Sequence, residues 1–171
     1  MESVKLFTDG SVDPQSKIGY GAYLALFDHG MSLDLLRSRV KLQRFEQTSS
    51  TKLELQTLLW ALEDSDTRGG RVVVYTDSQN IMGLPGRRER LEQNGYQSKK
   101  NSLIHNNELY QAFYRRMDES EIQFIKVQGH KRSFQKEAVD QIFTLVDRAS
   151  RNALRAETLT SSSGLNKKVR W

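Results

Sequence analysis

Hydrophobic positions in the first quarter of the chain follow the two-residue period of β-strands. Residues 4–8 form an apolar, β-prone run, and small and aromatic residues alternate over 19–27. A third β-prone stretch extends to about Phe45, and short segments containing Pro, Asp or Gly separate the three. Residues 3–45 are therefore predicted to form an antiparallel meander.

The apolar pattern changes to a helical period after residue 48. Leucines recur at helical spacing between the hydroxyl-rich segment 48–51 and Gly69, which predicts an amphipathic helix through about Asp66. Residues 71–76 follow, apolar almost throughout, as expected for a strand buried on both faces. A helix that connects two strands in this way favours a parallel arrangement of the later strand with its neighbour.

The second half of the chain is predicted to add helices and one more strand. In order, these are a helix over 78–84, a polar basic segment over 86–101, a helix over about 103–118, a strand over 122–127 and a helix over about 135–156. Pro85 and Gly86 are expected to end the first of these helices. The element order is typical of an α/β domain with a mixed sheet over 1–156, followed by a flexible basic tail over 157–171.

Composition narrows the class of protein. The 171 residues are 37% hydrophobic and 27% charged, as in a globular domain. The absence of cysteine excludes disulfides and thiolate metal sites, so a metal ion would need oxygen or imidazole ligands. The formal net charge of +5 favours a polyanionic partner, with nucleic acid as the first candidate.

Membrane and secretory signals are missing from the pattern. A membrane-spanning segment needs about 18 apolar residues, and no run in the chain approaches that length. Residues 1–5 lack the features of a signal peptide. We therefore expect a cytoplasmic protein without a membrane partner.

Three carboxylates occupy positions that a folded sheet would bring together. Asp9 follows the first apolar run, Asp77 follows the strand over 71–76, and Glu54 lies on the helix between them. Each has an ordinary interpretation: Asp9-Gly10 is a turn signal, Asp77 is a candidate helix N-cap, and Glu54 is a candidate surface residue. The flanking Leu53, Leu55 and Leu58 nevertheless indicate that Glu54 borders the buried face of its helix. If the two strands are neighbours, however, the three acids converge at one edge, where their repulsion favours a bound divalent cation such as Mg²⁺.

The motifs along the chain resemble those of type 1 ribonuclease H. They are, in order, F-T-D-G-S at 7–11, G-Y-G at 19–21, K-L-E-L at 52–55, Y-T-D-S-Q at 75–79, V-Q-G-H at 127–130 and V-D-R-A-S-R at 146–151. The resemblance covers roughly residues 3–155. It implies a ribonuclease H-like fold: a five-stranded mixed sheet in order 3-2-1-4-5 with helices on both faces.

The resemblance also implies an activity and a set of catalytic residues. A protein of this family is an endonuclease that hydrolyses the RNA strand of RNA–DNA hybrids with two Mg²⁺ ions (Mn²⁺ is an alternative) and leaves 5′-phosphates. Asp9, Glu54 and Asp77 match its first three metal-binding acids, and His130 matches a histidine that assists proton transfer or product release. The compact length favours a monomeric, stand-alone enzyme.

The fourth metal-binding acid has two candidates in this chain. Asp140 has the usual distance from His130, whereas Asp147 has the better local match in Asp147–Arg151. Their separation of seven residues is two helical turns, so both lie on one helix face. We favour Asp147 because the residues that follow it fit the family pattern.

Substrate-binding positions follow from the same resemblance. They are Ser11, Ser50, Thr51, Ser78, Arg87, Arg88, Tyr96, Lys99, Lys100 and Asn107. The basic segment over 86–101 resembles the protrusion that follows the DNA strand, although Tyr96 is its only aromatic residue. Ser50 and Thr51 lie where the family carries amides, so hydroxyl donors replace a paired donor and acceptor.

Two other functions share this fold. A non-catalytic nucleic-acid-binding module would typically have lost at least one acid, whereas all three strong candidates are present here. A DNA nuclease or recombinase of the superfamily usually carries further domains, for which 171 residues leave no room.

Overall fold

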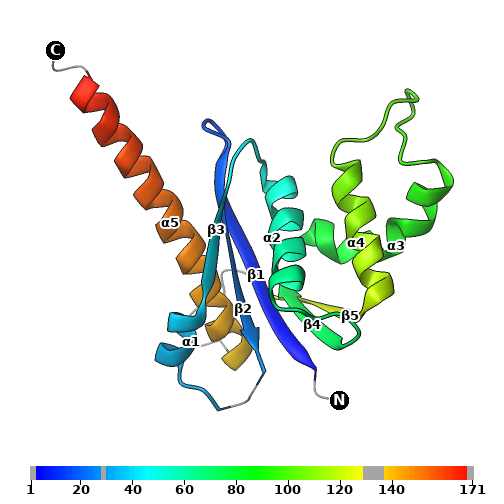
Figure 1. The fold of residues 1–171 in the computed structure, drawn as a ribbon, viewed down its shortest axis with the longest axis horizontal. Helices are drawn as coiled ribbons and strands as arrows, with labels where there is room; N and C mark the ends of the chain where they lie inside the picture. Colours follow the sequence, from blue (N-terminus) through cyan, green and yellow to red (C-terminus); the bar gives the residue numbers. More distant parts are fainter. Residues whose placement is uncertain (1–2, 28–29, 129–136, 169–171) are drawn as a thin grey trace.

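The computed structural model describes residues 3–27, 30–128 and 137–168, with side chains up to residue 161. Its strands form one mixed sheet in the predicted order β3-β2-β1-β4-β5 (Figure 1). The strands are β1 (Val4–Asp13), β2 (Ile18–Leu26), β3 (Lys41–Phe45), β4 (Arg71–Thr76) and β5 (Glu121–Lys126). β2 pairs antiparallel with β1 and β3, while β4 is parallel to both β1 and β5.

Helices cover both faces of this sheet, as predicted. They are α1 (Leu33–Arg39), α2 (Ser50–Asp64), α3 (Gln79–Gln93), α4 (Asn107–Glu119) and α5 (Ala138–Lys168). α2, α3 and α4 lie on one side in Figure 1, and α1 and α5 lie on the other. Among the described residues, no helix combines the length and the apolarity needed to cross a membrane.

Alternation along the central strands divides the core into two clusters. Leu6 and Val74 pack with the helices on the α2 side, whereas Phe7 and Tyr75 pack with α1 and α5. Successive side chains of a strand point to opposite faces, so a strand that is apolar throughout contributes to both clusters. This two-sided burial fixes the register of β1 against β4.

Small residues in the sheet let α2 approach it closely. A Cβ atom on Gly10 would lie 2.9 Å from Leu53 Cδ2, and one on Gly21 would lie 2.2 Å from Thr57 Oγ1. Real Cβ contacts are not that short, so a larger residue at either strand position would force α2 side chains to shift, most severely at Gly21. The close approach places the start of α2 beside the middle of β1.

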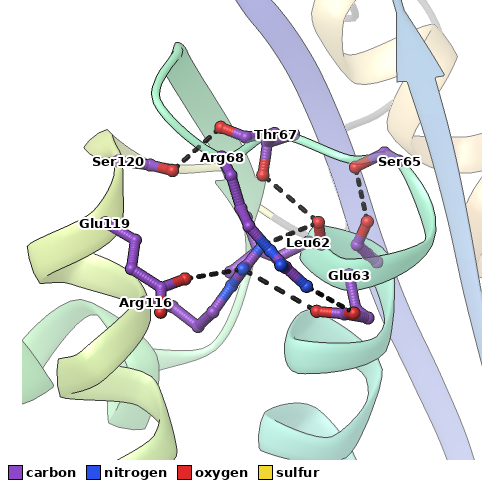
Figure 2. Close-up of polar contacts among 9 residues, drawn as sticks. Leu62, Glu63, Ser65, Thr67, Arg68, Arg116, Glu119 and Ser120 are labelled. Carbon is purple, nitrogen blue, oxygen red and sulfur yellow. Dashed lines mark hydrogen bonds and ion pairs between the residues drawn. The ribbon is translucent and has the colours of Figure 1, made fainter.

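A polar cluster joins the C-terminal ends of α2 and α4 (Figure 2). Arg116 on α4 donates from Nη2 to the carbonyl of Leu62 at 2.9 Å and from Nη1 to Glu119 Oε2 at 2.9 Å. Its side chain is only 10% exposed and also lies 3.7 Å from Glu63. Carbonyls at a helix C-terminus lack partners within the helix, and the guanidinium supplies one here.

Three helical regions differ from the sequence-based prediction. The short helix α1 was not predicted, because its leucines were assigned to a β-prone stretch; Ser32 caps it by accepting from Leu35 N at 3.2 Å. The prediction that Pro85 and Gly86 end a short helix was wrong, since α3 continues to Gln93.

Arg87 offers a physical reason for the length of α3. Proline has no N–H for the helical hydrogen bond, which normally weakens a helix at that point. The Arg87 side chain donates to the carbonyl of Asn80 at 3.1 Å, to Asn80 Oδ1 at 2.7 Å and to the carbonyl of Gly83 at 3.4 Å. These bonds stabilise the turn around Pro85.

α5 is also longer than predicted. It runs from Ala138 to Lys168, beyond the expected end near 156. Side-chain bonds from Ser11 to Ser150 and from Tyr20 to Glu157 hold it against the sheet past Asp147. These long-range contacts had no signal in the local sequence.

Candidate active site

The site lies where β1 and β4 separate. Their parallel pairing ends at Phe7 and Tyr75, whose rings stack with centroids 4.6 Å apart. Asp9 and Asp77 each come two residues after this last pair. The two acids therefore leave adjacent strands at the same edge of the sheet, as predicted.

The ordinary interpretations of these two aspartates do not describe the structure. Asp9 lies within β1, opposite Ala22, and the chain turns only after Asp13. The N-cap of α3 is Ser78, not Asp77. Neither a tight turn nor a helix cap therefore accounts for the position of Asp9 or Asp77.

Asp9 is the most strongly perturbed acid of the site. Its pKa is raised from 3.8 to about 8, mainly by burial and also by the neighbouring Asp77 and Asp147, while a hydrogen bond from the Gly10 N–H opposes these effects. The carboxyl groups of Asp9 and Asp147 are close enough to share a hydrogen bond. A desolvated carboxylate beside two others favours either a proton or a cation.

Glu54 reaches the same edge from α2. Its pKa is raised mainly by burial and also by the charge of Asp77, whereas a hydrogen bond from Ser78 lowers it. Ser78 Oγ donates to Glu54 Oε2 at 2.6 Å and accepts from the N–H of Ile81 at 3.1 Å. The glutamate therefore borders the buried face, as its leucine neighbours indicated.

The two candidates for the fourth acid have different surroundings. Asp147 contributes to the environment of Asp9, and its Oδ1 forms an ion pair with Arg151 Nε at 3.0 Å. Asp140 is buried near the start of α5, where its Oδ2 accepts from the N–H of Glu137 at 3.0 Å. Arg151 was missed by the sequence reasoning, although its spacing of four residues from Asp147 was a usable signal.

The donors at this edge are all carboxylates, which suits a hard divalent cation in its chemistry. Within the described ranges, no three acidic or histidine side chains are arranged closely enough to hold a metal ion. The perturbed pKa of Asp9 shows that the acids nevertheless interact. His130 lies outside the described residues.

The predicted substrate-binding residues are spread over three regions. Ser11 bonds to Ser150 at 3.1 Å beside the acids, while Ser50 and Thr51 open α2. Tyr96, Lys99 and Lys100 lie in the segment between α3 and α4, and Asn107 begins α4, where its side chain bonds to the carbonyl of Ile104.

Two of the three arginines in the basic segment, Arg87 and Arg88, form internal bonds. Arg88 makes two hydrogen bonds to Asp118, at 2.6 and 2.8 Å, and another to Glu92 at 2.8 Å. Arg87 binds carbonyls of its own helix, as described above. Lys99 and Lys100 are exposed and form no ion pair with any described residue.

Strand order, helix placement and an acidic edge between β1 and β4 define an α/β domain with a ribonuclease H-like fold. A solved structure of a foamy viral protease–reverse transcriptase in complex with dsDNA superposes with a TM-score of 0.60, at 12% identity over 86% of this chain and 94% of that one. The family model for RNase H matches residues 1–148, and the chain belongs to the ribonuclease H family.

Curated relatives agree with this assignment. A ribonuclease H from Syntrophomonas wolfei is 24% identical over 91% of this chain and 99% of its own length. Another from Novosphingobium aromaticivorans is 25% identical over 83% of this chain and 94% of its own. The family membership supports a nuclease activity for this protein.

Proposed function

We propose that this protein hydrolyses the RNA strand of RNA–DNA hybrids in a reaction that depends on Mg²⁺. The observation that supports it most is the position of Asp9, a partly buried carboxyl beside the point where β1 and β4 separate, whose pKa is raised by the nearby Asp77 and Asp147. A binding module has no need for mutually repelling acids at one edge of its sheet, because their repulsion destabilises a metal-free protein.

Asp9, Glu54, Asp77 and Asp147 would hold the ions in this proposal. Bound at these residues, two Mg²⁺ ions would supply an activated water and stabilise the leaving oxygen, so that the products would carry a 3′-hydroxyl and a 5′-phosphate. Ser78 orients Glu54 through its 2.6 Å hydrogen bond. Asp147 would be the fourth ligand in preference to Asp140, because Asp147 contributes to the raised pKa of Asp9. His130 would transfer a proton.

Preference for a hybrid requires contacts to both strands. Exposed Lys99 and Lys100 after α3 would contact the phosphates of the DNA strand. Ser50 and Thr51 at the start of α2 would donate to the RNA strand, where 2′-hydroxyls distinguish RNA from DNA. The weaker hydroxyl set at these positions leads us to expect a modest affinity.

A cleavage assay on labelled duplexes tests the proposal. RNA–DNA hybrid, double-stranded RNA, single-stranded RNA and duplex DNA are each incubated with Mg²⁺ or with EDTA. We expect cleavage of the hybrid alone, only with Mg²⁺. Cleavage of duplex DNA would instead favour a DNA nuclease, and hybrid cleavage in EDTA would refute the metal-dependent mechanism.

Paired variants locate the chemistry. Asp9→Asn should abolish cleavage while the protein still binds the hybrid. Asp66→Asn is the matched control, because it makes the same chemical change in an exposed residue just after the C-terminal end of α2. The φ angle of Asp66 is 49°, a backbone conformation that asparagine tolerates well. Full activity of a clean Asp9→Asn preparation would refute the site.

A further inference from the structure

The last part of α5 continues beyond the candidate active site and projects from the domain (Figure 1). Three contacts fix its direction as far as residue 157. Ser150 bonds to Ser11 of β1, and Glu157 accepts from Tyr20 Oη at 2.8 Å and from Arg44 Nε at 2.8 Å. This segment is therefore held against three strands of the sheet.

One face of the segment carries a row of arginines, which we call the arginine stripe: Arg148, Arg151 and Arg155. Their intervals of three and four residues place them on one side of an α-helix. Ser150 and Glu157, which contact the sheet, lie on the opposite side. Arg148 and Arg155 are exposed, and the Arg151 side chain is 49% exposed.

The charge of the stripe is largely unneutralised. Between residues 148 and 161 the only acid is Glu157, and its carboxylate is bonded to Tyr20 and Arg44 on the sheet side. Arg148 and Arg155 form no ion pair with any residue that the structure describes. By contrast, Arg88 of the basic segment is bonded to Asp118 and Glu92.

The stripe is continuous with the candidate active site. Arg151 pairs with Asp147, whose carboxyl contacts Asp9, and Arg148 follows Asp147 directly. From Arg148 to Arg155 the helix rises about 10 Å, and phosphates of one strand are spaced about 3.4 Å apart along a duplex axis. A duplex bound at the acids would thus have several phosphates within the length of the stripe.

We propose that the arginine stripe of α5 is a second binding surface for the nucleic-acid duplex, which contacts phosphates outside the cleavage site. The proposal rests on the proposed function for the identity of the duplex. Arginine suits the role because its planar guanidinium binds phosphate oxygens with two parallel hydrogen bonds. The anchored helix holds these groups at a fixed distance from the acids.

The salt dependence of binding tests this surface directly. The affinity of the full-length double variant Arg148→Gln/Arg155→Gln for an RNA–DNA hybrid is compared with that of the parent at several NaCl concentrations, in EDTA to prevent cleavage. Each lost phosphate contact should reduce the slope of log K against log[salt] by about 1, so we expect a reduction of about 2.

A matched control separates local contacts from net charge. Arg39→Gln/Arg71→Gln removes the same charge from exposed residues at the end of α1 and the start of β4. The control should keep the parental slope, and circular dichroism should show both variants folded. A slope unchanged in the stripe variant, or reduced equally in the control, would overturn the proposal.

Two further outcomes separate this proposal from its alternatives. A reduced slope in a protein that does not cleave the hybrid with Mg²⁺ would support the surface while refuting the proposed function. Binding of the parent and the stripe variant to phosphatidylserine vesicles is measured as well. If the variant loses vesicle binding while its salt slope with the hybrid is unchanged, the stripe is a lipid-binding surface and the proposal is overturned.

Discussion

Ser78 connects the N-terminus of α3 to Glu54, because its hydroxyl donates to Glu54 Oε2 while accepting from the N–H of Ile81. A single side chain thus caps a helix and orients an acid of the candidate site. The two roles predict two separable effects of its removal.

Ser78→Ala should lower both stability and activity. Loss of the N-cap is expected to reduce the free energy of unfolding by about 0.5–2 kcal/mol. Loss of the bond to Glu54 should reduce the rate of hybrid cleavage as well. Urea unfolding and single-turnover cleavage measure the two effects.

The control for Ser78 is Ser32→Ala, which removes only the N-cap of α1. This variant should lose stability without losing cleavage activity. Equal activity of the two alanine variants, measured where both are folded, would contradict the role of Ser78 in orienting Glu54.

Asp9 predicts an unusual dependence of stability on pH. Its folded pKa of about 8 lies above the unfolded value of 3.8, so the folded state favours the protonated carboxyl. The corresponding stability is present at low pH and is lost as pH rises from about 4 to about 8. Asp9→Asn removes this loss.

Melting curves in EDTA measure the effect. The Tm of Asp9→Asn minus that of the parent should be small near pH 4 and should grow to a plateau above pH 8. In a protein of this size, each kcal/mol added to the free energy of unfolding raises the Tm by about 2–4 °C. A difference that stays constant between pH 4 and pH 8 would exclude the raised pKa.

The sequence alone was sufficient to predict the positions of the candidate-site residues that lie at the ends of strand pairing. Apolar runs predicted β1 and β4, and the crossover rule predicted that these strands are parallel. Asp9 and Asp77 were then fixed at one edge by their positions after those runs. The leucines around Glu54 likewise indicated its half-buried position on α2.

The features that the sequence did not predict depend on contacts between side chains and elements that local patterns do not show. Asp140 and Asp147 share a helix face, so only the packing of α5 against β1 brings one of them to Asp9. Pro85 is a strong local signal for a helix end, yet α3 continues past it, and Arg87 hydrogen-bonds back to Asn80 across this turn. Neither effect is visible in a local pattern.

The contact between Gly21 and Thr57 predicts a strongly coupled pair. Gly21→Ala would place a Cβ atom 2.2 Å from Thr57 Oγ1, which should destabilise the protein by about 1–3 kcal/mol. Thr57→Ala removes that oxygen, which is buried without a partner among the described residues. Chemical unfolding should show the double variant to be more stable than Gly21→Ala alone.

Gly86→Ala serves as the control for that pair. Gly86 lies within α3, and a methyl group added to it would meet no described atom within 4 Å apart from its chain neighbours and the backbone of its own helix. Alanine is favoured over glycine in a helix by about 0.5–1 kcal/mol, so this variant should be slightly more stable than the parent. Additive effects of Gly21→Ala and Thr57→Ala would contradict the contact.

Arg116 and Arg68 provide a final contrast, because both pair with Glu63 at the end of α2 (Figure 2). Arg116 is buried and also binds the carbonyl of Leu62, so Arg116→Ala leaves that acceptor without its charged donor and should cost about 1.5–3 kcal/mol. Arg68 is 59% exposed, and Arg68→Ala should change stability little, since water screens the pair. Urea unfolding of both variants measures the difference. Equal losses would mean that the ion pair to Glu63, rather than the bond to the helix terminus, is the stabilising contact.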